Sequence, residues 1–253
     1  MTLAIETQGL TRRFGDVVAV DGLDLHVERG TFYGFLGPNG AGKSTTIKML
    51  TGLLAPTAGT MCVLDQDLSD ADGAREIRRR VGVVPEQLAL FDNLTAREYL
   101  TFVGRMYRLP VATVRDRCRE LLAMMSLENE ETKLTLEYSH GMKKKLALAA
   151  ALIPAPDILF LDEPFEGVDA VSSRVLRDLL KRSVQRGSTV FLTSHVLEIV
   201  EKLCTDVGII ANGKLVYQGT MDEVRQRGSL EEKFLEAVGR GQIERQTLSW
   251  LEG

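Results

Sequence analysis

Residues 37–44 read Gly37-Pro38-Asn39-Gly40-Ala41-Gly42-Lys43-Ser44, and this stretch decides the fold of the chain. It fits the pattern Gly-x-x-x-x-Gly-Lys-[Ser/Thr] in full. It follows a run typical of a strand, residues 31–36, and precedes a helical pattern over residues 43–54 that Gly52 and Pro56 bring to an end. A strand, a glycine loop and a helix in this order predict a P-loop, a phosphate-binding unit of α/β proteins.

The P-loop residues imply a nucleotide and its metal ion. Three glycines let the backbone curl so that successive N–H groups face inward, and the following helix directs the positive end of its dipole to the same point. Lys43 is expected to reach the β- and γ-phosphates and to take part in catalysis, and the Ser44 hydroxyl is expected to ligate Mg²⁺. The predicted nucleotide-binding residues of this loop are Gly37, Pro38, Asn39, Gly40, Ala41, Gly42, Lys43, Ser44 and Thr45.

Two adjacent carboxylates follow a second apolar strand. Residues 158–161 lead directly to Asp162 and Glu163, and α/β sheets place ligand-facing groups at the carboxyl ends of their strands. An acidic pair in this position is by itself typical of a helix start, but beside a P-loop it predicts catalysis. Asp162 suits Mg²⁺, directly or through water. Glu163 suits the general base that polarises the attacking water, a role worth about 10²–10⁴-fold in rate.

The remaining patterns extend this unit into a larger α/β fold. Apolar residues at helical spacing fill the middle third, and Asn212-Gly213 is typical of a hairpin turn. We expect a mainly parallel sheet, an antiparallel β portion contributed by the N-terminal strands, and a helical subdomain. The predicted strands are residues 4–8, 16–27, 31–36, 81–84, 158–161, 189–193, 207–210 and 214–218, and the predicted helices are residues 43–54, 94–107, 114–125, 172–185 and 196–203.

Charge and cysteine content argue against several classes of protein. The formal net charge of -4 gives the chain no overall basic field, so we expect no nucleic-acid partner. Cys62, Cys118 and Cys204 are widely spaced and form no Cys-x-x-Cys pair. This spacing favours buried thiols in a reducing compartment over a disulfide or zinc framework.

Hydropathy predicts no membrane span. The longest apolar run, residues 146–153, is far shorter than the roughly 20 residues that a spanning helix needs. Residues 1–15 lack the basic start and the apolar stretch of a secretory signal. We therefore expect a cytoplasmic protein.

A further motif carries a resemblance to a known family. Tyr138-Ser139-His140-Gly141-Met142 resembles the signature of the ABC (ATP-binding cassette) ATPases, whose common form is Leu-Ser-Gly-Gly-Gln. It keeps the Ser and the second Gly, and it is similar to the version in the family branch that serves many bacterial exporters. Taken alone, Ser139 before a helix is an ordinary N-cap. The resemblance assigns Ser139 and Gly141 to the γ-phosphate of ATP held by an opposite subunit.

The order of the other motifs also resembles an ABC ATPase, over residues 3–220. The resemblance implies that Phe14 stacks on adenine, that Asp169 lies in the loop crossing the dimer interface, and that His195 is the catalytic switch histidine. Taken alone, Phe14 would be interpreted as core and His195 as a packing residue. Glu86 aligns with a Mg²⁺-contacting glutamine, and Gln87 follows it; either fits this role. A Glu would bring extra negative charge near the phosphates, and we name Gln87 as the metal ligand.

The resemblance implies one subunit of a transporter. An ATP-binding domain would span residues 1–222 with a helical subdomain inserted at about 86–155, and residues 223–253 would form a short C-terminal helical extension. With ATP and Mg²⁺ as cofactors, two such subunits, identical or different, would close head to tail on the nucleotides. They would power transport, in the export direction by the branch resemblance, through separate membrane-spanning permease subunits docked beside residues 86–95. The chain would then lie at the cytoplasmic face of the cell membrane.

Two rival functions share the P-loop. Soluble ABC ATPases of translation or DNA repair usually carry tandem cassettes or long coiled-coil insertions, whereas this chain has one cassette, no heptad run and an acidic net charge. Small-molecule P-loop kinases predict neither the signature motif nor the switch histidine. The transported substrate is not encoded in these motifs, because the permease selects it.

Overall fold

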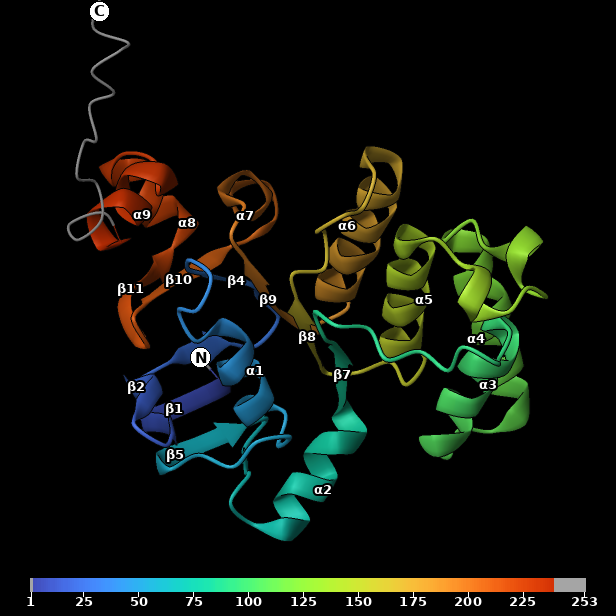
Figure 1. Ribbon diagram of the computed structural model, residues 1–253, viewed down its shortest axis with the longest axis horizontal. Helices are drawn as coiled ribbons and strands as arrows, with labels where there is room; N and C mark the ends of the chain where they lie inside the picture. The colour runs from blue at the N-terminus through green and yellow to red at the C-terminus, as the bar shows by residue number, and fades with distance from the viewer. Residues whose placement is uncertain (1, 239–253) are drawn as a thin grey trace, which may run out of the picture.

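The larger of two sheets contains the strand that leads into the P-loop. The computed structural model describes residues 2–238, and in this part of the chain the sheet comprises β4 (Phe32–Leu36), β7 (Val81–Val84), β8 (Ile158–Asp162), β9 (Thr189–Ser194), β10 (Asp206–Ala211) and β11 (Lys214–Thr220) (Figure 1). Their order is β11-β10-β4-β9-β8-β7. Only β11 pairs antiparallel, across the predicted Asn212-Gly213 turn. The prediction of a mainly parallel sheet is confirmed.

The second sheet is antiparallel and contains β1 (Leu3–Phe14), β2 (Val17–Leu23), β3 (His26–Glu28), β5 (Ala58–Val63) and β6 (Gln66–Asp67). The expected N-terminal antiparallel portion is therefore present, but β5 and β6 complete it from beyond the P-loop helix. The predicted strand 16–27 is interrupted, because β2 pairs with the second half of β1 and β3 with the first half. Gly22, with φ +62°, and Asp24, whose Oδ1 accepts a 2.6 Å hydrogen bond from the Gly9 N–H, lie at this change of partner.

Both faces of the larger sheet are buried. Side chains alternate along β8, so Leu159 and Leu161 join one apolar core while Ile158 and Phe160 join the other. The first core also takes α5 (His140–Leu152), α6 (Ala170–Gln185) and α7 (Leu197–Leu203). The second takes α1 (Lys43–Leu50) and the antiparallel sheet. Burial on both faces explains why β4 and β8 are almost entirely apolar, whereas the edge strand β11 is only partly buried and carries polar residues.

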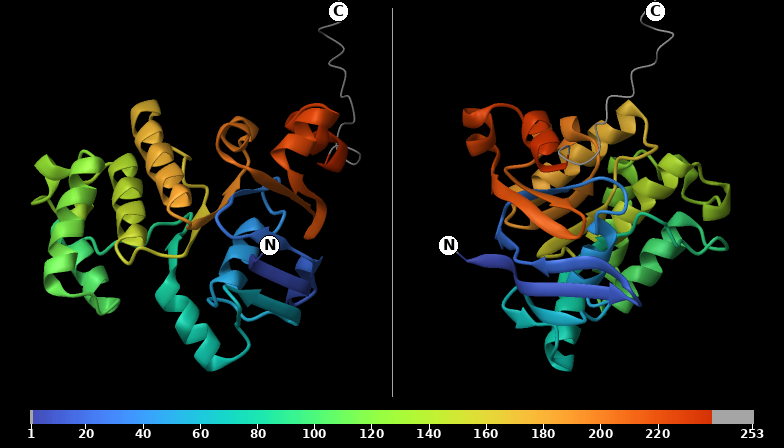
Figure 2. Two further views of the ribbon diagram at one scale, coloured as in Figure 1. Left: turned by 180° about the vertical axis from the view of Figure 1, so that it is seen from behind. Right: turned by 60° about the vertical axis from the view of Figure 1, so that its left-hand side comes forward.

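All elements between β7 and β8 are helical. Besides α5, they are α3 (Ala96–Met106), α4 (Val111–Met124) and the 3-10 turns η1 (Glu128–Glu130) and η2 (Thr135–Glu137). Figure 2 shows this green group at the end of the molecule opposite the blue antiparallel sheet. Leu100 of α3, Cys118 and Leu122 of α4, and Leu146 of α5 join one core. The limits of a helical subdomain at 86–155 and of a domain at 1–222 stay predictions.

Several element boundaries differ from those predicted. The helix predicted for residues 43–54 ends at Leu50, because Gly52 adopts φ +69°. The sequence patterns do not predict α2 (Ala71–Arg80), which buries only Gly73 and Ile77. Past β11 the chain forms α8 (Met221–Arg227) and α9 (Leu230–Val238), as expected of short terminal helices. The rest of the predicted extension, residues 239–253, lies outside the described residues.

The cysteines and the helix lengths bear on two further expectations. Cys118 and Cys204 are buried free thiols, and burial raises the pKa of both. Cys62 is also free but only half-buried, so the expectation of a buried thiol is wrong there. It lies in β5, a strand that the sequence patterns do not predict. No helix within residues 2–238 is both long and apolar enough to cross a membrane.

Candidate active site

Loops that follow four parallel strands meet at one edge of the larger sheet. The P-loop follows β4, Glu86 follows β7, Glu163 follows β8 and His195 follows β9. These strands are neighbours in the order β4-β9-β8-β7 and run in one direction. Their carboxyl ends therefore bring together residues that lie far apart in the sequence, as expected for a ligand site in an α/β sheet.

A cavity of about 240 Å³ lies at the P-loop. Its lining residues are Ala19, Pro38, Asn39, Gly40, Ala41, Gly42, Lys43, Ser44, Thr45, Glu86 and Glu163. Gly37 does not line the cavity, but a Cβ there would lie 2.4 Å from the carbonyl oxygen of Ile210. Gly42 has φ +109°, and a Cβ there would lie 2.5 Å from the carbonyl oxygen of Ala19. Only glycine fits at these two positions, because the loop lies close to the backbone of β10 at Gly37 and to that of β2 at Gly42.

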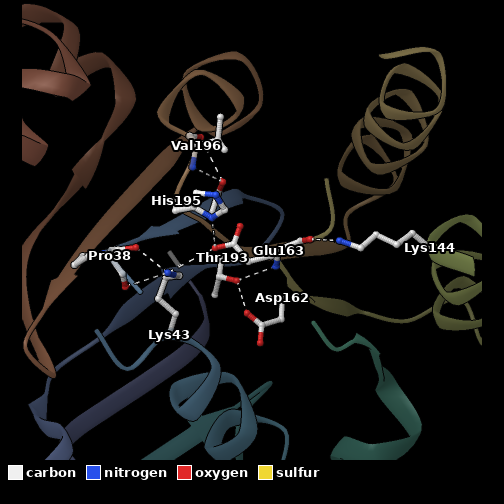
Figure 3. A network of polar contacts seen from close by, with 10 residues as sticks. Pro38, Lys43, Lys144, Asp162, Glu163, Thr193, His195 and Val196 are labelled. Carbon is white, nitrogen blue, oxygen red and sulfur yellow. Dashed lines mark hydrogen bonds and ion pairs between the residues drawn. The ribbon is translucent and has the colours of Figure 1, made fainter. Parts of the chain in front are cut away.

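Lys43 is a buried cation fixed within the loop. Its Nζ donates hydrogen bonds to the carbonyl oxygens of Gly37 at 2.7 Å and Pro38 at 3.2 Å (Figure 3). The same atom lies 3.6 Å from Oε1 of Glu163. Lys43 is also the first residue of α1, whose N-cap Gly42 supplies no side-chain hydrogen bond. A fixed ammonium group beside open helix N–H groups attracts phosphate oxygens.

Glu163 is buried with its carboxylate between two basic side chains. Its Oε1 lies 3.1 Å from Nδ1 of His195 and 3.6 Å from Nζ of Lys43. Its backbone has φ +48°, a left-handed conformation that is uncommon for a residue other than glycine and that concentrates at functional sites. Oε1 is shielded from solvent and accepts no hydrogen bond of ordinary geometry among the described residues. This acceptor is suited to a water molecule that enters the site.

Asp162 is held by a residue of the neighbouring strand. The Thr193 hydroxyl donates a 2.6 Å hydrogen bond to Oδ1 of Asp162 and accepts one of 3.1 Å from the backbone N–H of Glu163. The register of β8 with β9 pairs Asp162 directly with Thr193. Asp162 is 4% exposed and does not line the cavity, whereas Ser44 does. A carboxylate and a hydroxyl are the oxygen ligands that Mg²⁺ prefers, so this pair fits that ion.

The structure separates the two candidates for the glutamine position. Glu86 lines the P-loop cavity and Gln87 does not. The naming of Gln87 as metal ligand therefore finds no support in this geometry, and Glu86 is the residue placed beside the P-loop.

Ser139, Gly141 and Asp169 lie together but away from the P-loop cavity. The Ser139 hydroxyl accepts a 3.3 Å hydrogen bond from the Met142 N–H, so Ser139 is the N-cap of α5, as predicted. Asp169 caps α6 in the same way, and hydrogen bonds from Ser172 hold the pKa of Asp169 below its ordinary value. A Cβ on Gly141 would approach Oδ2 of Asp169 at 3.8 Å. None of the three lines the cavity that holds Lys43.

Phe14 and His195 both lie outside the lining of the P-loop cavity. Phe14 is 47% exposed, with the Arg12 guanidinium 4.6 Å from its ring centroid, so the interpretation of Phe14 as core is wrong. It does not line the P-loop cavity, and its stacking on adenine stays a prediction. The His195 side chain is 43% exposed and lines a second cavity of about 250 Å³ together with Glu163 and Gly167.

Two residues of the site were not identified from the sequence. Thr193 bonds the carboxylate of Asp162 and the backbone N–H of Glu163, and the Nζ of Lys144 donates a 2.7 Å hydrogen bond to the backbone oxygen of Glu163. The role of Thr193 depends on the strand order, which the sequence does not state. The burial of Lys144 could have been predicted from the sequence, because Lys144 lies three and four residues before the apolar Ala147 and Leu148 and therefore on the same, buried face of α5.

Comparison with known proteins identifies the family. The family described as "ABC transporter" matches residues 20–166. A daunorubicin/doxorubicin resistance ATP-binding protein of Streptomyces peucetius is 38% identical over 247 residues, 96% of this chain and 74% of that protein. The Nod factor export ATP-binding protein I of Ralstonia nicotianae is 39% identical over 227 residues, 88% of this chain and 69% of that protein.

A solved structure shows the same fold. It is the dimeric, post-hydrolysis state of an ATP-binding cassette bound to ADP and Pi, and it superposes with a TM-score of 0.78 at 25% identity over 86% of this chain and 98% of that one. The likeness extends beyond the P-loop core to nearly the whole of the solved cassette. One conclusion follows from the buried acid beside the P-loop lysine, from the signature helix α5 with its N-cap Ser139, and from these relatives: the chain belongs to the ABC transporter family, as a subunit that binds and hydrolyses ATP.

Proposed function

We propose that ATP is hydrolysed at the P-loop cavity with Glu163 as the general base. The observation that carries this proposal is the buried Oε1 of Glu163, which has no hydrogen-bond donor of ordinary geometry within residues 2–238 and lies 3.6 Å from the P-loop ammonium. Glu163 accepts the proton of the attacking water as that water adds to the γ-phosphorus and the bond from the γ-phosphorus to the bridging oxygen breaks, releasing ADP. Lys43 stabilises the charge on the phosphate oxygens, and His195, next to the same carboxylate, would contact the γ-phosphate.

The metal ion in this proposal is Mg²⁺. Ser44 and Asp162 would hold it, with Glu86 as the further acidic residue at the cavity. When bound, Mg²⁺ neutralises charge on the β- and γ-phosphates. Thr193 keeps Asp162 in a single orientation through its 2.6 Å hydrogen bond, which makes the carboxylate a preorganised ligand.

The active unit we propose is a pair of subunits with the nucleotides between them. Ser139 and Gly141 lie outside the cavity of their own P-loop, at the open N-terminus of a 13-residue helix. The N–H groups of such a terminus are suited to a phosphate presented from another molecule. Asp169, next to Gly141, would then lie at the contact between subunits. Hydrolysis removes the γ-phosphate that both subunits bind, so the pair opens.

The motion passes, in this proposal, to membrane-spanning permease subunits. Phe91 and Phe102 are 49% and 44% exposed, and their rings meet edge to face at 5.3 Å. Such exposed aromatic pairs mark binding surfaces, and Phe91 is in the segment that begins at Glu86 beside the nucleotide cavity. The chain would thus be attached to the cytoplasmic face of the membrane. The names of the relatives, drug resistance and Nod factor export, support export as the direction.

The proposal is tested with Glu163→Gln in the full chain. The amide keeps the shape of the side chain but cannot accept a proton, so hydrolysis should fall at least ~10²-fold while MgATP still binds. Sedimentation velocity should show a dimer that forms with MgATP and is absent when EDTA removes the metal. Parental ATPase activity in Glu163→Gln would contradict the role of Glu163. A monomer with MgATP would contradict the paired mechanism.

A further inference from the structure

A lysine is buried behind the catalytic carboxylate. Lys144 is in α5 and 3% exposed, whereas its neighbours Lys143 and Lys145 are half-buried. Its Nζ donates a 2.7 Å hydrogen bond to the backbone oxygen of Glu163, as Figure 3 shows. Lys144 does not line the P-loop cavity. Its ammonium therefore acts on the backbone of Glu163 and not on the nucleotide.

Several acidic side chains near Lys144 compensate the burial of its positive charge. Burial lowers the pKa of Lys144, and the carboxylates of Glu166, Glu163, Glu86 and Asp162 act in the opposite direction. Lysine is almost never buried unless it is paired, because an isolated buried charge is strongly disfavoured. The Lys144 cation interacts with these acids and with the carbonyl oxygen of Glu163, so it is matched to the loop that carries Glu163.

The backbone of Glu163 is held from two sides. Its N–H donates to the Thr193 hydroxyl on β9, and its carbonyl oxygen accepts from Lys144 on α5. Between these two hydrogen bonds the residue adopts φ +48°, a conformation that persists only where the surroundings impose it. Because the backbone direction sets where the side chain begins, these contacts determine the approach of Oε1 to Lys43 and His195.

We propose that Lys144 is a positioning residue for ATP hydrolysis, which holds the carbonyl of Glu163 so that the carboxylate faces the nucleotide cavity. The inference rests on the proposed role of Glu163 as general base. It assigns to the signature helix a second task, in its own subunit, besides the contact that its N-terminus offers to a nucleotide. Misplacement of a reacting group by about 1 Å can slow a reaction by about 10²-fold. Loss of the Lys144 ammonium should therefore affect the rate more than nucleotide binding.

The first test compares Lys144→Met, Lys144→Arg and Lys143→Met in the full chain. Methionine fills most of the space without donating, so kcat should fall about 10–100-fold while KM and the calorimetric Kd for MgATP change by less than about 2-fold. Arginine keeps a cation with N–H donors and should recover most of kcat. Lys143, whose Nζ is 3.9 Å from the exposed Asp92, is the matched control and should keep the parental rate. Each rate is divided by the fraction of protein that binds MgATP, which the calorimetric stoichiometry gives.

The second test repeats Lys144→Met in a Glu163→Gln background. If Lys144 acts through Glu163, the two losses are not additive, and the residual hydrolysis should change by less than about 2-fold. The inference is overturned if Lys144→Met causes an equal loss in both backgrounds, or if its kcat stays within about 2-fold of the parent. It is also overturned if Lys144→Arg is as slow as Lys144→Met despite an unchanged melting temperature. Each of these outcomes leaves the role of Glu163 intact, whereas a Glu163→Gln protein of parental activity overturns the proposed function instead.

Discussion

Lys43 makes contacts that no other side chain of the P-loop makes. Its Nζ lies within hydrogen-bond distance of two carbonyl oxygens and 3.6 Å from Glu163. Lys43→Ala removes the ammonium group and leaves the backbone N–H donors in place. We therefore expect the affinity for ATP itself to fall, on the order of 10-fold or more, because hydrogen bonds to charged groups are the strong ones. Isothermal titration calorimetry measures this directly.

The control for that measurement is Lys48→Ala. Lys48 is in the same helix but exposed to solvent, so its removal should leave the ATP affinity unchanged. An affinity of Lys43→Ala equal to that of Lys48→Ala would show that the loop does not hold phosphate through its lysine.

Residues whose role is written in a local pattern could be predicted, and residues whose role arises from packing could not. Lys43 lies within the complete P-loop pattern that follows β4, and Asp162 and Glu163 lie at the end of β8. Thr193 contacts the Asp162 carboxylate and the Glu163 backbone N–H only because β9 lies next to β8 in the sheet. That order is fixed by long-range pairing, which no local pattern contains.

At the scale of elements, α5 is the most informative helix, because its N-terminus faces away from its own P-loop cavity. Ser139→Arg replaces the N-cap with a bulky cation and obstructs the helix N–H groups. ATP binding by the isolated subunit should stay within about 2-fold of the parent, because Lys43 and its loop are untouched. ATP-driven dimerisation should be lost.

Sedimentation with and without ATP, in a Glu163→Gln background, separates these two effects. Ser69→Arg, an exposed position before α2, is the control and should still dimerise. If Ser139→Arg dimerises with ATP as readily as this control, the nucleotides are not shared between subunits, even though the chain remains an ATPase.

Elements with several apolar residues were predictable, while a helix made mostly of polar residues was not. Val81–Val84 forms β7 with the predicted bounds. By contrast, α2 exposes most of its residues, so its sequence shows no apolar stripe. The change of partner between β2 and β3 follows from Gly22 and Asp24, whose effect depends on the pairing with β1.

At the scale of the whole molecule, the larger sheet divides the interior into two cores. Its strands send alternate side chains to the α5–α7 side and to the α1 side. Glu163 and Asp162 stand where these cores meet at the strand ends, and the three contacts that fix them come from β9 and α5. The fold class followed from the sequence because buried parallel strands and their helices are regular. The sequence did not predict that the same strands contribute to two cores, because this depends on the strand order of the sheet.

The separation of Ser139 from its own nucleotide cavity has a genetic consequence in a homodimer. Each ATP would depend on Lys43 and Glu163 of one subunit and on Ser139 of the other. Ser139→Arg and Glu163→Gln chains are each expected to be inactive alone. In a mixed dimer, however, both lesions fall on the same ATP, and the second site is assembled entirely from unaltered residues. Co-expression of the two defective alleles, with differently tagged chains purified as a mixed pair, should therefore restore ATPase activity to a measurable fraction of the parent. Two chains altered at Glu163 should show no such complementation, and its absence from the Ser139→Arg and Glu163→Gln pair would mean that each subunit works with its own signature helix.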